Sequence, residues 1–333
     1  MSKRIVFTIL IGAVIVITYT AFSFLKIRAN RQLPVFVNKY DEDRSVKFPE
    51  TIEDSIKKEK ALKELAEAIK KQEEGLPDKE EKNTDDESRQ DSPDSCKVLD
   101  YEKLKTLSAT RLAWWIKLNS EHKPTTISQD IQDMISEYDG IYIGDISQKK
   151  IYLTFDEGYE NGYTSKILNT LKENSVKAAF FVTSPYIKGN SGLVKRMIDE
   201  GHVVGNHTMR HPSLPSLKAA ELENELLGLE KQFKEMFGTG FKYMRPPRGE
   251  YSERVLAASK QLGYKTAFWS YAYKDFDVSD QKGADYAYKK VMDNLHNGAV
   301  ILLHAVSKDN ADALDRIIKD AKSQGYEFSP FDL

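Results

Sequence analysis

The stretch KKIYLTFDEG, residues 149–158, begins as a short apolar run and ends in two acidic residues and a glycine. Five more apolar runs of similar length follow along the chain: VKAAFFVT (176–183), HVVGN (202–206), FKYMRPP (241–247), YKTAFWS (264–270) and GAVILLH (298–304). Segments with apolar residues three or four apart, the spacing of amphipathic helices, separate these runs. The pattern predicts an α/β fold over residues 140–333, either a small distorted (β/α) barrel or, as the alternative, a doubly wound open sheet.

Polar residues follow most of the predicted strands at the point where each strand ends. They lie in the segments 154–158, 205–212, 245–249, 269–275 and 302–304. In both candidate folds, functional side chains gather at the carboxyl ends of the parallel strands. We therefore expect acids, bases and hydrogen-bond donors from five strands to form one site.

Two histidines four residues apart, His207 and His211, stand before Pro212 in the segment HTMRHP. One turn could direct both imidazoles at a metal ion, and a carboxylate from another strand, Asp156 or Glu157, would complete the site and leave a position for water. The alternative is a pair of surface or capping histidines. Three further histidines, in ordinary loop or strand-edge contexts, are interpreted as structural: His122, His202 and His296.

The motifs TFDEG, HTMRHP, RPPRG and the LLH strand together resemble the motif series of the NodB-homology polysaccharide deacetylases, carbohydrate esterase family 4. The resemblance covers residues 140–333 and implies the distorted (β/α) barrel of that family. The longer segments IYLTFDEGYENGYT, MRPPRGEYS, AFWSYAYKDFD and ILLHAVSKDNADAL are similar to the delta-lactam-biosynthetic de-N-acetylases of spore-forming bacteria. That subgroup acts on N-acetylmuramic acid in cortex peptidoglycan.

The resemblance assigns a role to each of the first group of polar residues. Asp156 matches the general base, which takes a proton from the attacking water. His207 and His211 match ligands of a divalent metal, with zinc expected, and Glu157 stands where most of the family has a metal-binding aspartate. Arg245 matches the arginine that pairs with the catalytic aspartate and keeps it ionised.

His304 matches the general acid that protonates the departing amine, and Leu302 matches the apolar wall beside the acetyl methyl group. Asp275 would hold His304 as an acid partner holds an imidazole. The motif that contains Asp275 usually reads DxxDW in this family. Here Ala272 replaces the first aspartate and Phe276 replaces the tryptophan, so only the second aspartate is kept.

Two residues are candidates for contact with substrate. The backbone N–H of Arg248 would, by the family pattern, help to stabilise the tetrahedral oxyanion. Many family members have tyrosine at this position, and the Arg248 guanidinium suits a carboxylate such as the lactyl group of muramic acid; the alternative is a salt bridge at the rim. Trp269 is either a wall of the pocket or a core residue.

The first 139 residues differ in texture from the rest. Ile5–Leu25 has no charged residue, and its 21 residues are long enough as a helix to cross a bilayer. We predict a membrane anchor over 1–30, with a cleaved signal peptide as the alternative. We expect residues 31–98 to form a charged, largely disordered linker in which one helix is possible, and residues 99–139 to form an extension that packs on the catalytic domain.

Composition limits the remaining classes of function. The net charge of −2 over 333 residues offers no general attraction to nucleic acid, and the single cysteine excludes an intrachain disulfide. The prediction is a membrane-bound, extracytoplasmic de-N-acetylase of N-acetylmuramic acid in peptidoglycan glycan strands. It would lead to muramic delta-lactam and would act after an amidase has removed the stem peptide. The alternatives are a deacetylase of N-acetylglucosamine or chitooligosaccharides, and a catalytically inactive glycan-binding wall protein.

Overall fold

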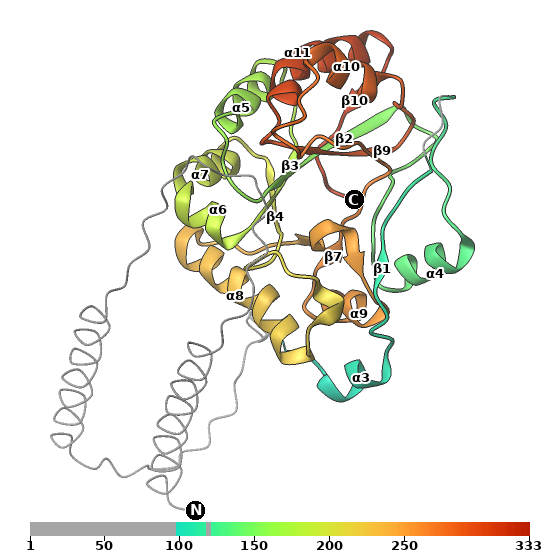
Figure 1. Ribbon diagram of the computed structural model, residues 1–333, viewed down its shortest axis with the longest axis vertical. Coiled ribbons are helices and arrows are strands. Elements are labelled where there is room, and N and C mark those ends of the chain that lie inside the picture. Colours follow the sequence, from blue (N-terminus) through green and yellow to red (C-terminus); the bar gives the residue numbers. More distant parts are fainter. Residues whose placement is uncertain (1–97, 118–120) are drawn as a thin grey trace, which may run out of the picture. The chain divides into compact units, whose positions relative to one another are not determined.

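The computed structural model describes residues 98–117 and 121–333 (Figure 1). The predicted anchor, and the linker up to residue 97, lie outside the described residues. Within the described residues, no helix combines the length and apolar character needed to cross a membrane.

The chain alternates strands and helices as the apolar runs predict. The strands are β1 (Leu112–Ala113), β2 (Lys150–Glu157), β3 (Ala179–Val182), β4 (Val203–Asn206), β5 (Tyr243–Met244), β6 (Glu250–Tyr251), β7 (Lys265–Thr266), β8 (Tyr271–Ala272), β9 (Ala299–His304) and β10 (Glu327–Phe328). The α-helices are α3 (Tyr101–Thr106), α4 (Gln129–Glu137), α5 (Thr164–Glu173), α6 (Ser184–Gly189), α7 (Ser191–Asp199), α8 (Ala219–Phe237), α9 (Glu253–Gln261), α10 (Ala284–Met292) and α11 (Lys308–Ser323). Two 3₁₀ turns, η1 (Leu214–Ser216) and η2 (Pro247–Gly249), complete the order.

The main sheet closes on itself. Its strands run parallel in the order β7-β5-β4-β3-β2-β9-β8, and β10 adds to the start of β2. The two end strands, β7 and β8, are separated by residues 267–270 alone, so one continuous segment pairs with β5 at one end and β9 at the other. This connection confirms the distorted barrel and disfavours an open sheet. The helices lie around the outside of the strands (Figure 1).

Strict alternation along β2 separates two hydrophobic layers. Tyr152 packs with the smaller cluster inside the barrel, whereas Ile151, Leu153 and Phe155 pack with the larger cluster under the helices. The interior cluster contains Tyr152, Ala179, Phe181, Tyr243, Ala267, Val300 and Phe331. By the same alternation, Asp156 faces the interior at the end of the strand.

The described residues before the barrel pack on it. β1 pairs antiparallel with β6, and Trp114 lies buried against Phe268, with ring centroids 4.5 Å apart. The Trp114 indole N–H donates to the carbonyl of Trp269 at 2.9 Å. Its backbone N–H donates to the carbonyl of Gly249 at 2.8 Å. The extension thus fixes two segments that follow barrel strands.

Candidate active site at the carboxyl ends of the strands

A cavity of about 610 Å³ opens at the carboxyl ends of the barrel strands. It brings together residues from β2, β8 and β9 and from the segments that follow β2, β4, β5, β7, β8 and β9. Its lining residues are Asp156, Gly158, Tyr159, His207, His211, Arg248, Gly249, Trp269, Ala272, Tyr273, Phe276, Leu302, His304 and Val306. Seven of the ten candidate residues from the sequence are among them.

Arg245 and Asp156 form a buried ion pair beneath this cavity. The Arg245 Nη1 donates to Asp156 Oδ1 at 2.8 Å and to Thr154 Oγ1 at 2.9 Å. Its other nitrogens donate to the carbonyls of Ala267 and Phe268, and the guanidinium lies 4.1 Å from the Phe181 ring centroid. These contacts fix the orientation of the guanidinium before substrate arrives.

The arginine also decides the charge of the acid. Burial alone would raise the pKa of Asp156, but the Arg245 charge, with smaller help from His207 and His304, holds the pKa of this carboxyl below its ordinary value. Asp156 is therefore an ionised carboxylate at the cavity wall, as a general base requires.

His207 and His211 lie together, with ring centroids 4.9 Å apart. The His207 Nδ1–H donates to the carbonyl of Arg245 at 2.8 Å, which leaves Nε2 free to face Asp156 Oδ2 at 3.5 Å. Burial lowers the pKa of His207, and burial followed by the His207 charge lowers the pKa of His211 to about 4. Both imidazoles are thus neutral at neutral pH, the form that ligates metals.

Glu157 does not join the two histidines. Its side chain is buried on the opposite face of β2, where Thr164 Oγ1 donates to Oε1 at 3.4 Å. Burial, and then the Glu160 charge, raise the pKa of Glu157 well above its ordinary value. The expected grouping of Glu157 with the histidines is corrected by strand geometry, because adjacent residues of a regular strand face opposite sides.

The two histidines suit a divalent cation, since each is neutral and lines the cavity. Across residues 98–117 and 121–333, no group of three or more histidine, cysteine or acidic side chains is arranged to hold a metal. The fit is therefore to an ion with His207 and His211 as protein ligands and Asp156 close by, without the third ligand expected from Glu157.

His304 ends β9 beside Asp156, its register partner across the sheet. Asp275 Oδ1 accepts the His304 Nδ1–H at 2.7 Å, and Asp275 Oδ2 accepts the His304 backbone N–H at 2.7 Å. Burial would lower the pKa of His304, but the Asp275 carboxylate outweighs it and raises that pKa. The pair matches the arrangement implied by the resemblance and leaves the Nε2 of His304 for the cavity.

Asn310 and Tyr273 complete this pair, and the sequence reasoning missed both. The Asn310 amide donates to Asp275 Oδ2 at 2.5 Å, and the Tyr273 hydroxyl donates to Asn310 Oδ1. Asn310 lies in the first turn of α11, which Ser307 caps. In the sequence, Ser307 marks the start of a helix after the LLH strand, but nothing local marks Asn310 as the residue that holds Asp275.

The apolar part of the cavity comes from three strand ends. Leu302 and Trp269 both line it, so Trp269 is a pocket wall. Ala272 and Phe276, which depart from the DxxDW pattern, line it as well, and the Phe276 ring lies 5.6 Å from the His304 ring. Tyr159, on the loop after β2, is half-exposed and adds a further aromatic surface.

Arg248 lies at the cavity rim in a strained turn. Its φ of 57° is in the left-handed region, and the next residue, Gly249, also has positive φ. A Cβ on Gly249 would come within 2.8 Å of the Trp269 ring, so this position requires glycine. The half-exposed Arg248 side chain reaches Glu250 at a loose 3.7 Å, and its guanidinium makes no side-chain hydrogen bond to another described residue.

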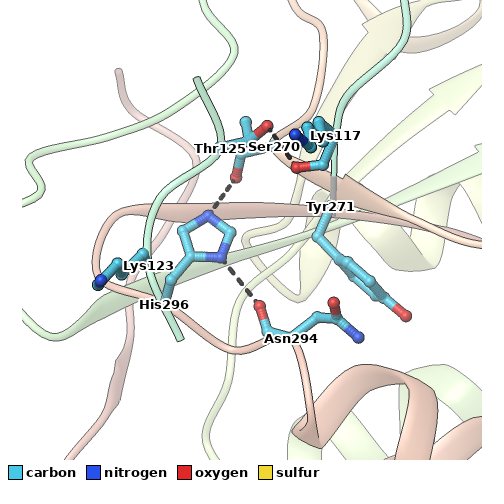
Figure 2. A pocket seen from close by; sticks show the side chains of 7 residues that line it. All are labelled: Lys117, Lys123, Thr125, Ser270, Tyr271, Asn294 and His296. Atoms are coloured by element: carbon cyan, nitrogen blue, oxygen red, sulfur yellow. Dashed lines mark hydrogen bonds between the residues drawn. The ribbon is translucent and has the colours of Figure 1, made fainter. Parts of the chain in front are cut away.

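The three histidines interpreted as structural do not line this cavity. Figure 2 shows His296 in a small polar pocket, with Nδ1 donating to the Asn294 carbonyl and Nε2 bonded to Ser270 Oγ, both at 2.9 Å. His202 Nδ1 accepts the Ala178 N–H at 3.1 Å, and His122 Nδ1 bonds to the Leu295 carbonyl at 2.8 Å. Each of the three histidines thus has at least one hydrogen bond outside the cavity.

Known proteins share this fold and these motifs. A polysaccharide deacetylase family model matches residues 144–267. The peptidoglycan-N-acetylmuramic acid deacetylase PdaA of Bacillus subtilis is 45% identical over 220 residues, which cover 66% of this chain and 84% of PdaA. The peptidoglycan-N-acetylglucosamine deacetylase PgdA of Listeria monocytogenes is 37% identical over 186 residues, 56% of this chain and 39% of PgdA.

The solved structure of Bacillus subtilis PdaA, a family 4 carbohydrate esterase, superposes with a TM-score of 0.66 at 44% identity, covering 68% of this chain and 97% of that chain. Enzymes of this family are generally metal-dependent. The shared barrel, the motif residues gathered at one cavity and these similarities identify the chain as a polysaccharide deacetylase, a member of carbohydrate esterase family 4.

Proposed function

We propose that this chain hydrolyses the acetamide of N-acetylmuramic acid in peptidoglycan, releasing acetate and a free amine. The amine would then close on the lactyl carboxyl to give muramic delta-lactam. The observation that carries this choice of sugar is Arg248, whose cation lies on the rim of the same cavity as Asp156 and His304. The similarity to an N-acetylmuramic acid deacetylase supports it.

The chemistry follows from the protonation states of the two catalytic groups. Ionised Asp156 accepts a proton from water while the oxygen of that water attacks the acetyl carbon. Protonated His304 then donates a proton to the amide nitrogen as the C–N bond breaks. His207 and His211 would hold a divalent ion, which we expect to be zinc. When bound, such an ion supplies polarisation of water and of the amide carbonyl. The N–H of Arg248 is the candidate donor to the oxyanion.

Arg248 supplies the means of telling muramic acid from glucosamine. Muramic acid carries a lactyl carboxylate that glucosamine lacks, and a guanidinium can bind a carboxylate with two parallel hydrogen bonds. The competing rim salt bridge is weak here, because the Glu250 contact is 3.7 Å long and the arginine side chain is 51% exposed. The guanidinium is therefore available to a substrate anion.

Replacing Arg248 by tyrosine tests this proposal. The loss of a charge-assisted hydrogen bond should cost about 1.5–3 kcal/mol. That corresponds to roughly a tenfold to a hundredfold fall in kcat/KM on muramic acid substrates. Activity on N-acetylglucosamine units should fall much less, because the backbone N–H is retained. Equal losses on both glycans would show that Arg248 supports its loop, and an unchanged muramic rate would return it to the rim salt bridge.

The substrate itself is tested by mass spectrometry of muropeptides after incubation with peptide-stripped glycan. Deacetylated muramic acid or its lactam supports the proposal, whereas free amines on glucosamine alone would establish the alternative N-acetylglucosamine or chitooligosaccharide deacetylase. No deacetylation of either would favour an inactive glycan-binding wall protein. Parallel incubation with intact peptidoglycan tests whether an amidase must act first.

The proposed location follows from the substrate. Peptidoglycan lies outside the cytoplasmic membrane, so we propose that Ile5–Leu25 anchors the chain with its catalytic barrel on the outer side. Membrane fractionation of the full chain, followed by N-terminal sequencing, separates a retained anchor from a cleaved signal peptide.

A further inference from the structure

The loop that carries the two cavity histidines has an unfavourable backbone. Two of its residues, Thr208 and His211, have φ angles of 70° and 59°. Non-glycine residues rarely adopt this left-handed conformation, and they keep it only where the surroundings impose it. Holding His207 and His211 at one place therefore depends on groups that fix the loop.

Every backbone N–H from Thr208 to His211 has a partner, and one residue outside the loop supplies two of them. Met209 N–H donates to the carbonyl of Glu225 at 3.1 Å, and Arg210 N–H donates to Glu225 Oε2 at 2.9 Å. The other two bonds are local: Thr208 N–H to Asn206 Oδ1 at 2.9 Å, and His211 N–H to Thr208 Oγ1 at 3.0 Å.

The Glu225 carboxylate is buried and hydrogen-bonded at both oxygens. Glu225 lies on α8 and is 1% exposed, and its second oxygen, Oε1, accepts from Arg210 Nε at 2.6 Å. In the same stretch of α8, the Leu226 carbonyl accepts a hydrogen bond from the Asn206 side-chain amide. Met209 packs over Gly228, where an added Cβ would lie 3.2 Å from the Met209 side chain. Residues 225–228 thus form a platform beneath the histidine loop.

We propose that Glu225 is a positioning residue, which holds the loop 207–211 so that both imidazoles face one point in the cavity. Its side chain lies outside the cavity lining and acts through the backbone N–H of Arg210, whereas the Met209 N–H is held by the main-chain carbonyl of Glu225. The inference rests on the two-histidine site of the proposed function but not on the identity of the sugar.

The chain offers two matched controls. Arg210→Ala removes the guanidinium, which is 75% exposed, but keeps the backbone N–H that Glu225 Oε2 accepts. Glu230 is a second buried acid on α8, 4% exposed, and it accepts hydrogen bonds from Phe241 N–H and the Tyr264 hydroxyl, away from the cavity lining. Glu230→Ala therefore reports the cost of losing a buried carboxylate that does not hold the loop.

The experiment measures Zn²⁺ affinity of the metal-free full chain by competition with a chromogenic chelator, with Tm and kcat alongside. We expect Glu225→Ala to weaken Zn²⁺ binding and to lower kcat by about 10- to 100-fold, the usual effect of losing a group that orients ligands. Arg210→Ala should lower both quantities less than Glu225→Ala does, because the backbone N–H of Arg210 still donates to Glu225 Oε2. Glu230→Ala should lower Tm and leave Zn²⁺ affinity unchanged.

Unchanged Zn²⁺ affinity and kcat in Glu225→Ala, with a Tm loss equal to that of Glu230→Ala, would overturn the proposal. If Glu225→Ala does not fold, Glu225→Gln replaces it. The glutamine side chain keeps the shape of the glutamate, but its single oxygen cannot accept from both the backbone N–H and the Nε of Arg210. Zn²⁺ affinity and kcat equal to those of the parent would then overturn the proposal. A parent chain that neither binds Zn²⁺ nor deacetylates glycan refutes the proposed function, which is a different outcome.

Discussion

Replacing Arg245 by methionine should destabilise the folded chain by about 3–5 kcal/mol at neutral pH, the cost of removing one partner of a buried ion pair. Arg245 is 0% exposed and Asp156 is 7% exposed, so water can replace the lost guanidinium only in part. Methionine fills much of the same volume, which limits the packing loss. The main term is the carboxylate left buried without the 2.8 Å contact to Nη1.

The loss should depend on pH with a definite sign. In the parent, the pKa of Asp156 lies below its unfolded value of about 3.9, so the pair stabilises the fold above that pH and its contribution is lost as pH falls through the lowered pKa. In the variant, the strongest effect opposing burial is gone, so the pKa of Asp156 rises relative to the parent. The stability gap between parent and variant should therefore narrow as the pH is lowered and Asp156 takes up a proton.

Urea unfolding of the parent, Arg245→Met, Asp156→Asn and the double variant at pH 7 measures this directly. Most of the cost of Arg245→Met should disappear in the Asp156→Asn background, since no charge is then left unpaired. An equal cost in both backgrounds would refute the attribution to Asp156. It would place the loss instead in the hydrogen bonds to the carbonyls of Ala267 and Phe268.

Three further predictions concern the reaction. Asp156→Asn should keep the fold and lower kcat to a few per cent of the parent or less, because it removes the base with little change in packing; greater residual activity contradicts its role. His207→Ala and His211→Ala should each lower bound metal and kcat together, and unchanged metal content in both would reject the site. Asp275→Asn should lower the pKa of His304 and move the alkaline limb of the kcat/KM profile to lower pH, since the carboxylate that raises this pKa is gone; an unmoved limb argues against His304 as the acid.

The sequence was sufficient for most of the barrel strands and for the place where the site forms. Short apolar runs separated by helical spacing predicted β2, β3, β4, β5, β7 and β9, but not the two-residue strands β6 and β8. The rule that parallel strands end at one edge brought Asp156, His207 and His304 together. The closure of the barrel was harder to predict from the sequence. It depends on residues 267–270 linking β7 to β8, and one short apolar run carries no sign that its two ends pair with different strands.

Residues that act through a neighbour were also missed. Asn310 holds Asp275 across 35 positions of chain, and Glu225 binds the backbone of Arg210 across 15. Neither carries a local pattern that distinguishes it from an ordinary helix residue. Their roles depend on which face of a helix meets the strand ends, and that is decided by packing of the whole domain.

The position of Glu157 follows from the alternation of side chains along β2 and not from the metal-binding role that the family resemblance implied. Asp156 and Glu157 are neighbours, yet alternation along β2 sends them to opposite sides of the sheet. Asp156 meets the Arg245 cation and its pKa falls, whereas Glu157 is buried near Glu160 with no described cation in contact, and its pKa rises. Two identical functional groups thus acquire opposite charge preferences, the condition that separates a base from an acid. The period of two that makes β2 a strand therefore decides which of the two carboxylates can serve as the base.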